Sequence, residues 1–196
     1  MSISMRITIH ICGILLMCAS QVQASSVEYR AKWSGVSYLN QATAIALMTI
    51  DTEVWPNPAN FMSSSTSAAG ITKLNMTVSG ASSGNGIFNL ADFGTTYWGT
   101  NGATLDMSRE LVGQSTSGQT FGSTSGSGGE FNFFPAANGN PATPSGSWYF
   151  TLTTNGGNGD SMVLTSFAPV PEPTSCALAA VATLALLTRR RRSTNG

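Results

Sequence analysis

The stretch 27-VEYRAKWSGV-36 decides the fold class of this chain. Every second residue is apolar, and these residues share one face: Val27, Tyr29, Ala31 and Trp33. The residues between them are polar or charged. A period of two with charges on the opposite face is typical of a half-buried β-strand. We therefore predict a strand over this stretch, and look for others around it.

Later segments of the body, residues 25–168, also predict short strands. Residues 44–50 are apolar on both parities, and the neighbouring threonines favour a strand over a short helix. Alternating or aromatic patterns follow in KLNMTVSG, GIFNLADF, TTYW and EFNFF, and a final hairpin joins SWYFTLTT to SMVLTSF through a Gly-Asn turn. About seven or eight strands separated by turns predict an all-β fold, an antiparallel β-sandwich or jelly-roll-like domain.

Loops of distinctive composition interrupt these strands. WPNPANF, residues 55–61, breaks regular structure at its two prolines, and a serine-rich loop follows. The run GQSTSGQTFGSTSGSGG, residues 113–129, is rich in glycine and serine, so we expect it to be mobile and to form no core. No helix of normal length is expected in the body.

The charges are unevenly distributed, although the formal net charge is +0. Five of the nine basic residues are Arg6 and the arginines at 189–192, whereas Glu172 is the one acidic residue of nine outside the body. The body therefore holds four basic and eight acidic residues. An acidic body without a basic patch excludes nucleic acid as an expected partner.

The N-terminal segment has the three parts of a secretory signal. Arg6 precedes an apolar run over residues 7–19, and the segment closes on Val22-Gln23-Ala24, which has small residues where signal peptidase reads. We predict a signal peptide over 1–24, cleaved by signal peptidase after Ala24. A permanent membrane helix is the less favoured alternative, because the run is well short of the ~20 residues that span a bilayer.

The C-terminal segment predicts a short transmembrane helix. Residues 174–188 carry no charge, and Arg189, Arg190, Arg191 and Arg192 follow at once. Such a helix is about 22 Å long at ~1.5 Å per residue, shorter than the ~30 Å hydrocarbon core, so it inserts by thinning the bilayer or by snorkelling. The arginines would hold their side in the cytoplasm, and the body would face outward.

A Pro-Glu-Pro motif lies just before that helix. Pro171 and Pro173 flank Glu172 and favour an extended, exposed strip at the membrane surface. The order Val170-Pro171-Glu172-Pro173, short helix and arginine cluster resembles the PEP-CTERM sorting signal. The resemblance covers residues 169–196. It implies export in a bacterium that makes extracellular polysaccharide and processing by exosortase, a membrane transpeptidase-like enzyme, but no activity for the body. A plain membrane anchor is the alternative.

The body lacks the side chains of several common catalytic sites. His10, Cys12 and Cys18 lie in the predicted signal peptide, and Cys176 lies in the tail. Ser-His-Asp and Cys-His catalysis, zinc sites of thiolate or imidazole ligands, and disulfides within the body are thereby excluded. We predict no catalytic residue, no metal and no cofactor.

Carboxylates are the remaining candidates for chemistry. Asp51 and Glu53, at i and i+2, would project from one strand face as a glycosidase pair, although a solvated strand end is the favoured interpretation. Asp106 and Glu110 flank Arg109 and predict surface ion pairs of little energetic value.

A calcium site is a weaker candidate. GGNGD, residues 156–160, is one residue short of the G-G-x-G-x-D repeat that binds calcium, so a hairpin turn is favoured. Asp92 and Asp160 with loop carbonyls are the hard oxygen ligands that such a site would use.

The four tryptophans divide into two predicted groups. Trp33 and Trp148 fall on apolar faces, which predicts core packing. Trp55, in the proline loop, and Trp98, before Gly99, are the candidate ligand-binding residues, because exposed aromatic rings stack on sugars.

These observations together predict an exported, non-catalytic protein of the cell surface or extracellular matrix. It would be held in the inner membrane through its C-terminal helix until exosortase processes it. The alternatives are a carbohydrate-binding module for extracellular polysaccharide and, less favoured, a carboxylate-based glycoside hydrolase.

Overall fold

The computed structural model describes residues 26–171, of which residues 26–170 belong to one compact unit. The predicted cleavage after Ala24, the motif from Glu172 onward, and the helix and arginines of the tail lie outside the described residues.

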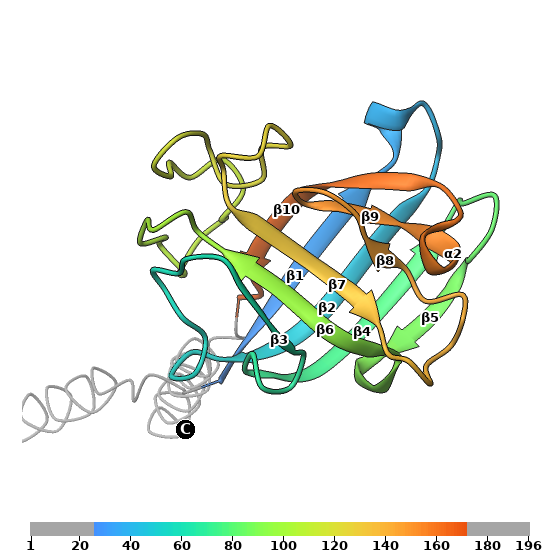
Figure 1. The fold of residues 1–196 in the computed structure, drawn as a ribbon, viewed down its shortest axis with the longest axis horizontal. Coiled ribbons are helices and arrows are strands. Elements are labelled where there is room, and N and C mark those ends of the chain that lie inside the picture. Colours follow the sequence, from blue (N-terminus) through green and yellow to red (C-terminus); the bar gives the residue numbers. More distant parts are fainter. Residues whose placement is uncertain (1–25, 172–196) are drawn as a thin grey trace, which may run out of the picture. The chain divides into compact units, whose positions relative to one another are not determined.

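The described chain folds into two antiparallel sheets (Figure 1). The larger sheet has the order β5-β4-β2-β1-β10-β9-β8. Its strands are β1 (Ser26–Ser34), β2 (Thr43–Asp51), β4 (Ile71–Ser79), β5 (Gly86–Asn89), β8 (Ser145–Gly146), β9 (Thr151–Thr153) and β10 (Ser161–Pro169). The smaller sheet has the order β3-β6-β7, with β3 (Met62–Ser65), β6 (Phe93–Gly99) and β7 (Glu130–Pro135). The predicted all-β, antiparallel fold is confirmed.

Helices are short throughout the described range. They are η1 (Val36–Tyr38), η2 (Leu90–Asp92) and α2 (Thr154–Gly157). Within residues 26–171, no helix has the length and apolarity needed to cross a bilayer.

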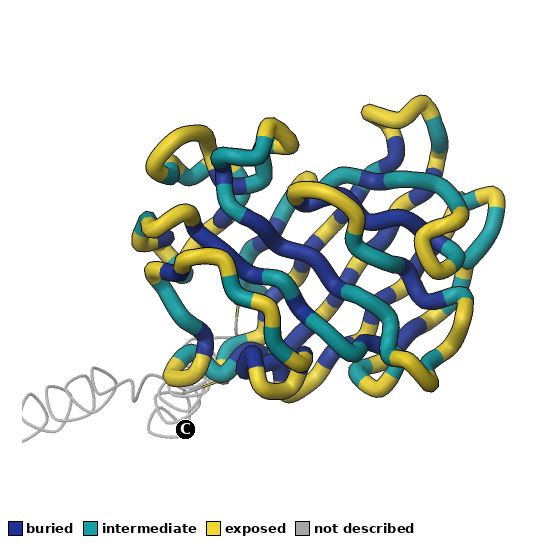
Figure 2. Tube along the Cα trace, viewed as in Figure 1, coloured by how far each residue is buried: buried dark blue, intermediate teal, exposed yellow. Residues whose placement is uncertain are grey.

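The strand predicted from VEYRAKWSGV is β1, and it lies near the middle of the larger sheet. It pairs with β2 on one side and β10 on the other, so that Ala31 faces Ala46 and Phe167 across the two ladders. Tyr29, Ala31 and Trp33 are buried while the residues between them are exposed. Figure 2 shows this alternation along the strands of the larger sheet.

Aromatic side chains fill the space between the two sheets. Phe131 of β7 stacks on Phe167 of β10 at 4.5 Å and on Trp33 of β1 at 5.9 Å between ring centroids. Trp98 of β6 meets Phe131 edge-on at 6.1 Å. Each such pair contributes about 0.5–1.5 kcal/mol beyond the burial of area. Packing of this kind makes the arrangement sandwich-like.

Some details of the prediction were wrong. Residues 26–171 contain ten strands, because β3 forms within the segment predicted as a serine-rich loop and pairs with β6, and the two-residue β8 pairs with β9. A strand over 44–50 is confirmed as part of β2, but Ile45 and Leu47 remain 44% and 41% exposed on its outer face. The final hairpin is confirmed as β9 and β10, joined through α2.

The prediction that the glycine- and serine-rich run, residues 113–129, forms no core was also wrong. Phe121 at its centre is fully buried and contacts Phe150 at 4.8 Å and Trp98 at 5.4 Å between ring centroids. One large aromatic residue therefore ties a run of small polar residues to the core.

Candidate functional site: an aromatic cleft

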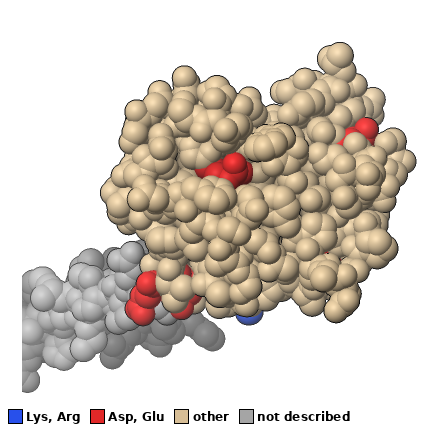
Figure 3. Space-filling model, in the orientation of Figure 1, with Lys and Arg blue, Asp and Glu red and all other residues tan. Residues whose placement is uncertain are grey.

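A cleft of about 300 Å³ opens beside the smaller sheet. Its lining residues are largely aromatic, glycine or small polar: Phe61, Tyr97, Gly99, Asn101, Gly126, Gly129, Glu130, Ser147, Trp148 and Tyr149. Figure 3 shows an acidic side chain in a hollow of this face, with basic side chains visible only at the lower edge. Clefts of this size that combine apolar walls with few polar groups are the usual form of ligand sites.

The pleat of β6 and β7 brings the first lining residues together. Trp98 and Phe131 point into the core, so their strand neighbours Tyr97 and Glu130 point to the opposite face. The register pairs Gly99 with Glu130, and a Cβ at Gly99 would lie 3.1 Å from the Cα of Phe61, so glycine lets residue 61 pack closely against β6 at the cleft.

Three aromatic rings extend along this outer face. The ring of Tyr97 lies 4.3 Å from that of Phe134 and 5.1 Å from that of Phe61, which it meets edge-on. Phe61 is 61% exposed although it follows a loop that packs on the core. Tyr97 is thus supported from both sides while the cleft stays open.

The segment before β9 forms the opposite wall. Tyr149 and Phe150 have positive φ values of 35° and 60°, which are uncommon outside glycine. This break in the strand sends Phe150 into the core and leaves Trp148 75% exposed at the cleft. Core packing of Trp148 was therefore wrongly predicted, because strict alternation ends at this point.

Glu130 is the polar centre of the cleft. Glu130 is only 9% exposed, and its carboxylate accepts a hydrogen bond from the Asn132 amide and interacts favourably with the backbone N–H groups of Tyr149 and Phe150. The unusual backbone of residues 149–150 therefore also brings two N–H groups close to the carboxylate. The Asn132 amide occupies one of the roughly four acceptor positions of the carboxylate, which leaves capacity for a ligand donor.

Burial raises the pKa of the Glu130 carboxyl above its ordinary value, and the neighbouring N–H groups of Phe150, Asn132 and Tyr149 oppose that rise. The charged form is penalised because the strand and the overlying segment keep water from it. Because folding has already removed most water from this carboxyl, a ligand hydroxyl can bind to it with little further loss of hydration.

Two glycines shape the wall contributed by residues 100–129. Gly129 has φ +108°, and a Cβ there would lie 2.3 Å from the Gly99 carbonyl oxygen. Gly126 has φ +92°, and a Cβ there would lie 2.7 Å from the Tyr149 ring. The close approach of this loop to β6 and to Tyr149 therefore requires glycine at both positions.

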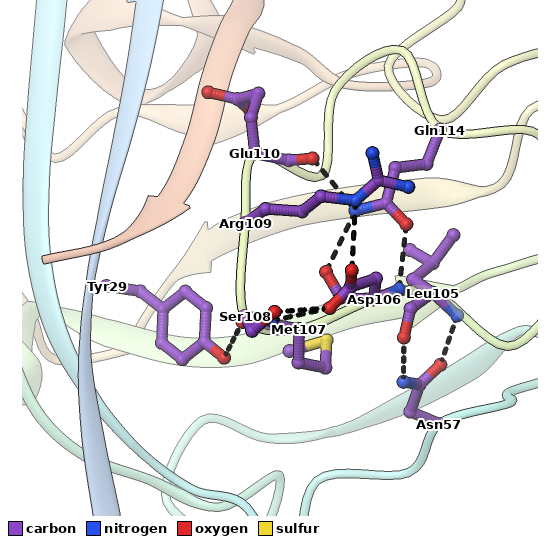
Figure 4. A network of polar contacts seen from close by, with 9 residues as sticks. All are labelled: Tyr29, Asn57, Leu105, Asp106, Met107, Ser108, Arg109, Glu110 and Gln114. Carbon is purple, nitrogen blue, oxygen red and sulfur yellow. Dashed lines mark hydrogen bonds and ion pairs between the residues drawn. The ribbon is translucent and has the colours of Figure 1, made fainter. Parts of the chain in front are cut away.

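A polar network anchors the same loop where it leaves the cleft (Figure 4). Asn57 bonds both backbone groups of Leu105, at 2.7 and 2.9 Å. Tyr29 of β1 donates to the carbonyl of Met107 at 2.8 Å, and burial followed by the nearby Asp106 charge raises the pKa of Tyr29 to about 12. The phenol therefore remains a donor across the physiological range.

Gln114 closes this network. Its amide nitrogen donates to the carbonyls of Asp106 and Glu110, and its amide oxygen accepts from the Asp106 N–H at 2.7 Å. Asp106 forms the predicted ion pair with Arg109 at 3.0 Å. Glu110 instead accepts from the Ser166 hydroxyl and from the Phe167 N–H, both at 2.6 Å. These contacts fasten the loop to β10.

The two tryptophans predicted to bind ligand are in the core. Trp55 is 4% exposed and Trp98 is fully buried, with their ring centroids 4.7 Å apart. The Trp98 ring nitrogen donates to the Pro56 carbonyl at 2.8 Å, so the proline loop folds back over the indole. Neither ring presents a face to a ligand. The exposed aromatic residues of the cleft replace them as the candidate ligand-binding residues.

The predicted carboxylate pair is not formed on one strand face. Asp51 ends β2, and Glu53 lies in the turn that follows, where its N–H donates to the Asp51 carboxylate at 3.0 Å. This contact is a turn-forming bond of the kind that aspartate makes with the residue two places on.

The two aspartates considered for calcium have structural partners. Asp160 accepts from the Ser82 N–H, and these hydrogen bonds with Ser82 lower its carboxyl pKa. Asp92 accepts from the Asn89 N–H at 2.8 Å and caps η2. Among the described residues, no group of three or more His, Cys, Asp or Glu side chains is placed to hold a metal.

No family model, curated protein or solved structure matches this chain. The cleft is therefore interpreted from its own chemistry. It offers exposed aromatic rings for stacking, one hydrogen-bonded carboxyl, and small polar groups at its edge. Sequence reasoning missed it because its members come from four separate segments, and the one available signal was the consecutive aromatic pair Trp148-Tyr149 beside glycine and serine.

Proposed function

We propose that this chain is an exported, non-catalytic protein of the cell surface or extracellular matrix that binds extracellular polysaccharide in the aromatic cleft. The observation that carries the proposal is the 75% exposed Trp148 facing a cleft whose centre is the buried Glu130 carboxyl. A large exposed indole is costly in water, and its retention beside polar acceptors favours a ligand with both apolar and hydroxyl faces.

Sugars have both kinds of surface. The C–H faces of a pyranose ring are apolar and pack on Trp148, Tyr149 or Tyr97, whereas its hydroxyls reach the carboxylate of Glu130 and the side chains of Asn101 and Ser147. The rings are already supported by neighbours such as Phe134, so little ordering is needed on binding.

A binding role is preferred to glycoside hydrolysis. Hydrolases of this class use two carboxyl groups about 5–9.5 Å apart. Among the described residues lining the cleft, Glu130 is the only carboxylate, and Asp51 and Glu53 are not cleft residues. The carboxyl is also held by the Asn132 amide, as a positioned acceptor would be.

Export and sorting are proposed from the two ends of the chain. The signal-like segment ending at Ala24 and the order Pro-Glu-Pro, apolar segment and arginine cluster support translocation by way of the inner membrane, with signal peptidase and exosortase as processing partners. The body would then reach the surface or matrix, where polysaccharide is available to it.

Replacement of Trp148 tests the binding proposal. We expect Trp148→Ala to weaken binding of polysaccharide roughly tenfold or more, the loss from uncovering one stacked aromatic face. Because the side chain is exposed, the melting temperature should change little. Affinity electrophoresis or calorimetry with polysaccharide from the native host measures the effect.

Ile87→Ala is the matched control. Ile87 is 69% exposed on β5 and does not line the cleft, so its truncation removes exposed apolar surface elsewhere. Equal binding by wild type and Trp148→Ala, or equal losses in both variants, would contradict the proposal.

A further inference from the structure

We infer that the cleft selects neutral polysaccharides and excludes acidic ones, with the Glu130 carboxylate as the discriminating group. The inference rests on the proposed function, because it names the class of sugar that the same cleft accepts. It follows from where the charges of the body lie.

The cleft holds an anion without a compensating cation. Among the described residues that line it, Glu130 is the only one with a charge, and no lysine or arginine is present. Its hydrogen-bond donors, the Asn132 amide and two backbone N–H groups, are neutral. A uronate or sulfate group in the cleft would therefore meet a like charge in a partly desolvated space, where such repulsion is least screened.

The cations of the body are directed elsewhere. Arg30 and Lys32 of β1 and Lys73 of β4 are exposed and alternate with core residues, so they lie on the outer face of the larger sheet. The cleft lies beside the other sheet. Arg109, the fourth cation, forms an ion pair with Asp106 at 3.0 Å. None of these groups is placed to neutralise an acidic sugar in the cleft.

Glu130 also has little freedom to move away from an approaching anion. Its side chain is buried on β7 under the segment 147–150, and both that segment and Asn132 hold the carboxylate. The fully buried Asn132 and Phe150 fix the donors in turn. The carboxylate is therefore held in one position, and in its ionised form it acts against anionic ligands.

Chemically matched glycans test this inference. The full chain, purified in detergent, is titrated at pH 7 and low salt with neutral glucan, mannan, galactan and xylan. Each glycan is also supplied in carboxymethylated form, which adds negative charge, and in hydroxyethylated form, which adds a neutral group of similar size. We expect the hydroxyethylated form of the bound glycan to bind at least about tenfold more tightly than the carboxymethylated form.

Two variants assign the effect to Glu130. Glu130→Gln removes the charge and should bring the affinities of the two forms to within about threefold. Ser147→Lys places a cation at an exposed edge of the cleft while Glu130 stays in place, and should raise the affinity for the carboxymethylated form. Ser147→Lys keeps the test decisive where Glu130→Gln fails to fold.

The outcomes separate this inference from the proposed function. Equal affinity of wild type for the charged and neutral forms would overturn the inference and leave polysaccharide binding standing. Unchanged discrimination in both variants would also overturn it, because the charge of the cleft would then not be the cause. Failure of wild type to bind any glycan, including host polysaccharide, would overturn the proposed function itself.

Discussion

Trp98 and Trp148 have the same side chain and opposite positions in this protein. Trp98 precedes a glycine, and the sequence predicted it to be exposed. It is instead fully buried and donates a hydrogen bond to the Pro56 carbonyl. Trp148 continues an apolar alternation and reads as core, yet it is 75% exposed. The difference arises from backbone conformations that the local sequence pattern does not reveal. A loop covers Trp98, and two residues with positive φ follow Trp148.

Glu130 gives a prediction about stability and pH. Burial raises its pKa in the folded state above the unfolded value, so between the two values the folded protein binds more protons than the unfolded chain. The contribution of this carboxyl to stability is therefore greatest below the unfolded pKa and declines as pH rises through the folded pKa. We expect the melting temperature of wild type minus that of Glu130→Gln to fall as pH rises above the unfolded pKa of about 4.3 and to level off above the folded pKa.

Glu53→Gln is the control for this experiment, because Glu53 is exposed in the turn after β2. Thermal unfolding followed by circular dichroism measures all three proteins. A difference between wild type and Glu130→Gln that stays constant with pH would show that the carboxyl is not desolvated in the fold.

Among the elements, the 100–129 loop depends most on tertiary contacts. It contributes Asn101, Gly126 and Gly129 to the cleft, and its one fully buried aromatic side chain is Phe121. We expect Phe121→Ala to lower the free energy of unfolding by about 3–5 kcal/mol, as for other buried phenylalanines. We also expect cleavage within residues 113–129 at protease concentrations that leave wild type intact, because the loop loses its anchor to Phe150 and Trp98.

Chemical denaturation and limited proteolysis with mass mapping measure the two effects. Leu39→Ala, which removes a side chain that is 98% exposed in the turn after η1, serves as the control and should change neither. Protease resistance equal to that of wild type would mean that the polar network around Gln114 is sufficient to hold the loop.

The strands of the larger sheet were more predictable than those of the smaller one. In β1 and β4 alternation directly reports burial, because each has one face on the core and one in solvent. β7 is buried at four successive positions, Glu130 to Phe133, because the segment 145–150 covers its outer face. β3 is a serine-rich edge strand, and only pairing with β6 makes it a strand.

The whole molecule yields a prediction about its processing. The protein recovered from the surface and medium of its own host should have an intact mass that begins near Ser25 and ends within the Pro-Glu-Pro region. This prediction follows from the proposed export, in which signal peptidase cuts the signal-like N-terminus and exosortase cuts the Pro-Glu-Pro tail. A mass that retains Arg189 to Arg192 would show a lasting membrane anchor and contradict processing by exosortase.

The body contains no cysteine, so no disulfide can form within it and the packing of side chains must hold its two sheets together. Aromatic contacts such as Phe131 on Phe167 join the two sheets, whereas small secreted domains often use disulfides. The aromatic residues of this body thus have two uses, those between the sheets for stability and those outside the smaller sheet for the proposed ligand.

The periodicity of β1, β2 and β4 and the turn residues between them were enough to predict antiparallel sheets, because these signals are local and depend on a strand having two different faces. Composition likewise predicted a body without histidine or cysteine chemistry. The cleft was decided only by the tertiary structure. Phe61, Tyr97, Glu130 and Trp148 are far apart in sequence, and they meet because the pleat of β6 and β7 turns two of them outward while a left-handed backbone at Tyr149 and Phe150 folds the last one over them.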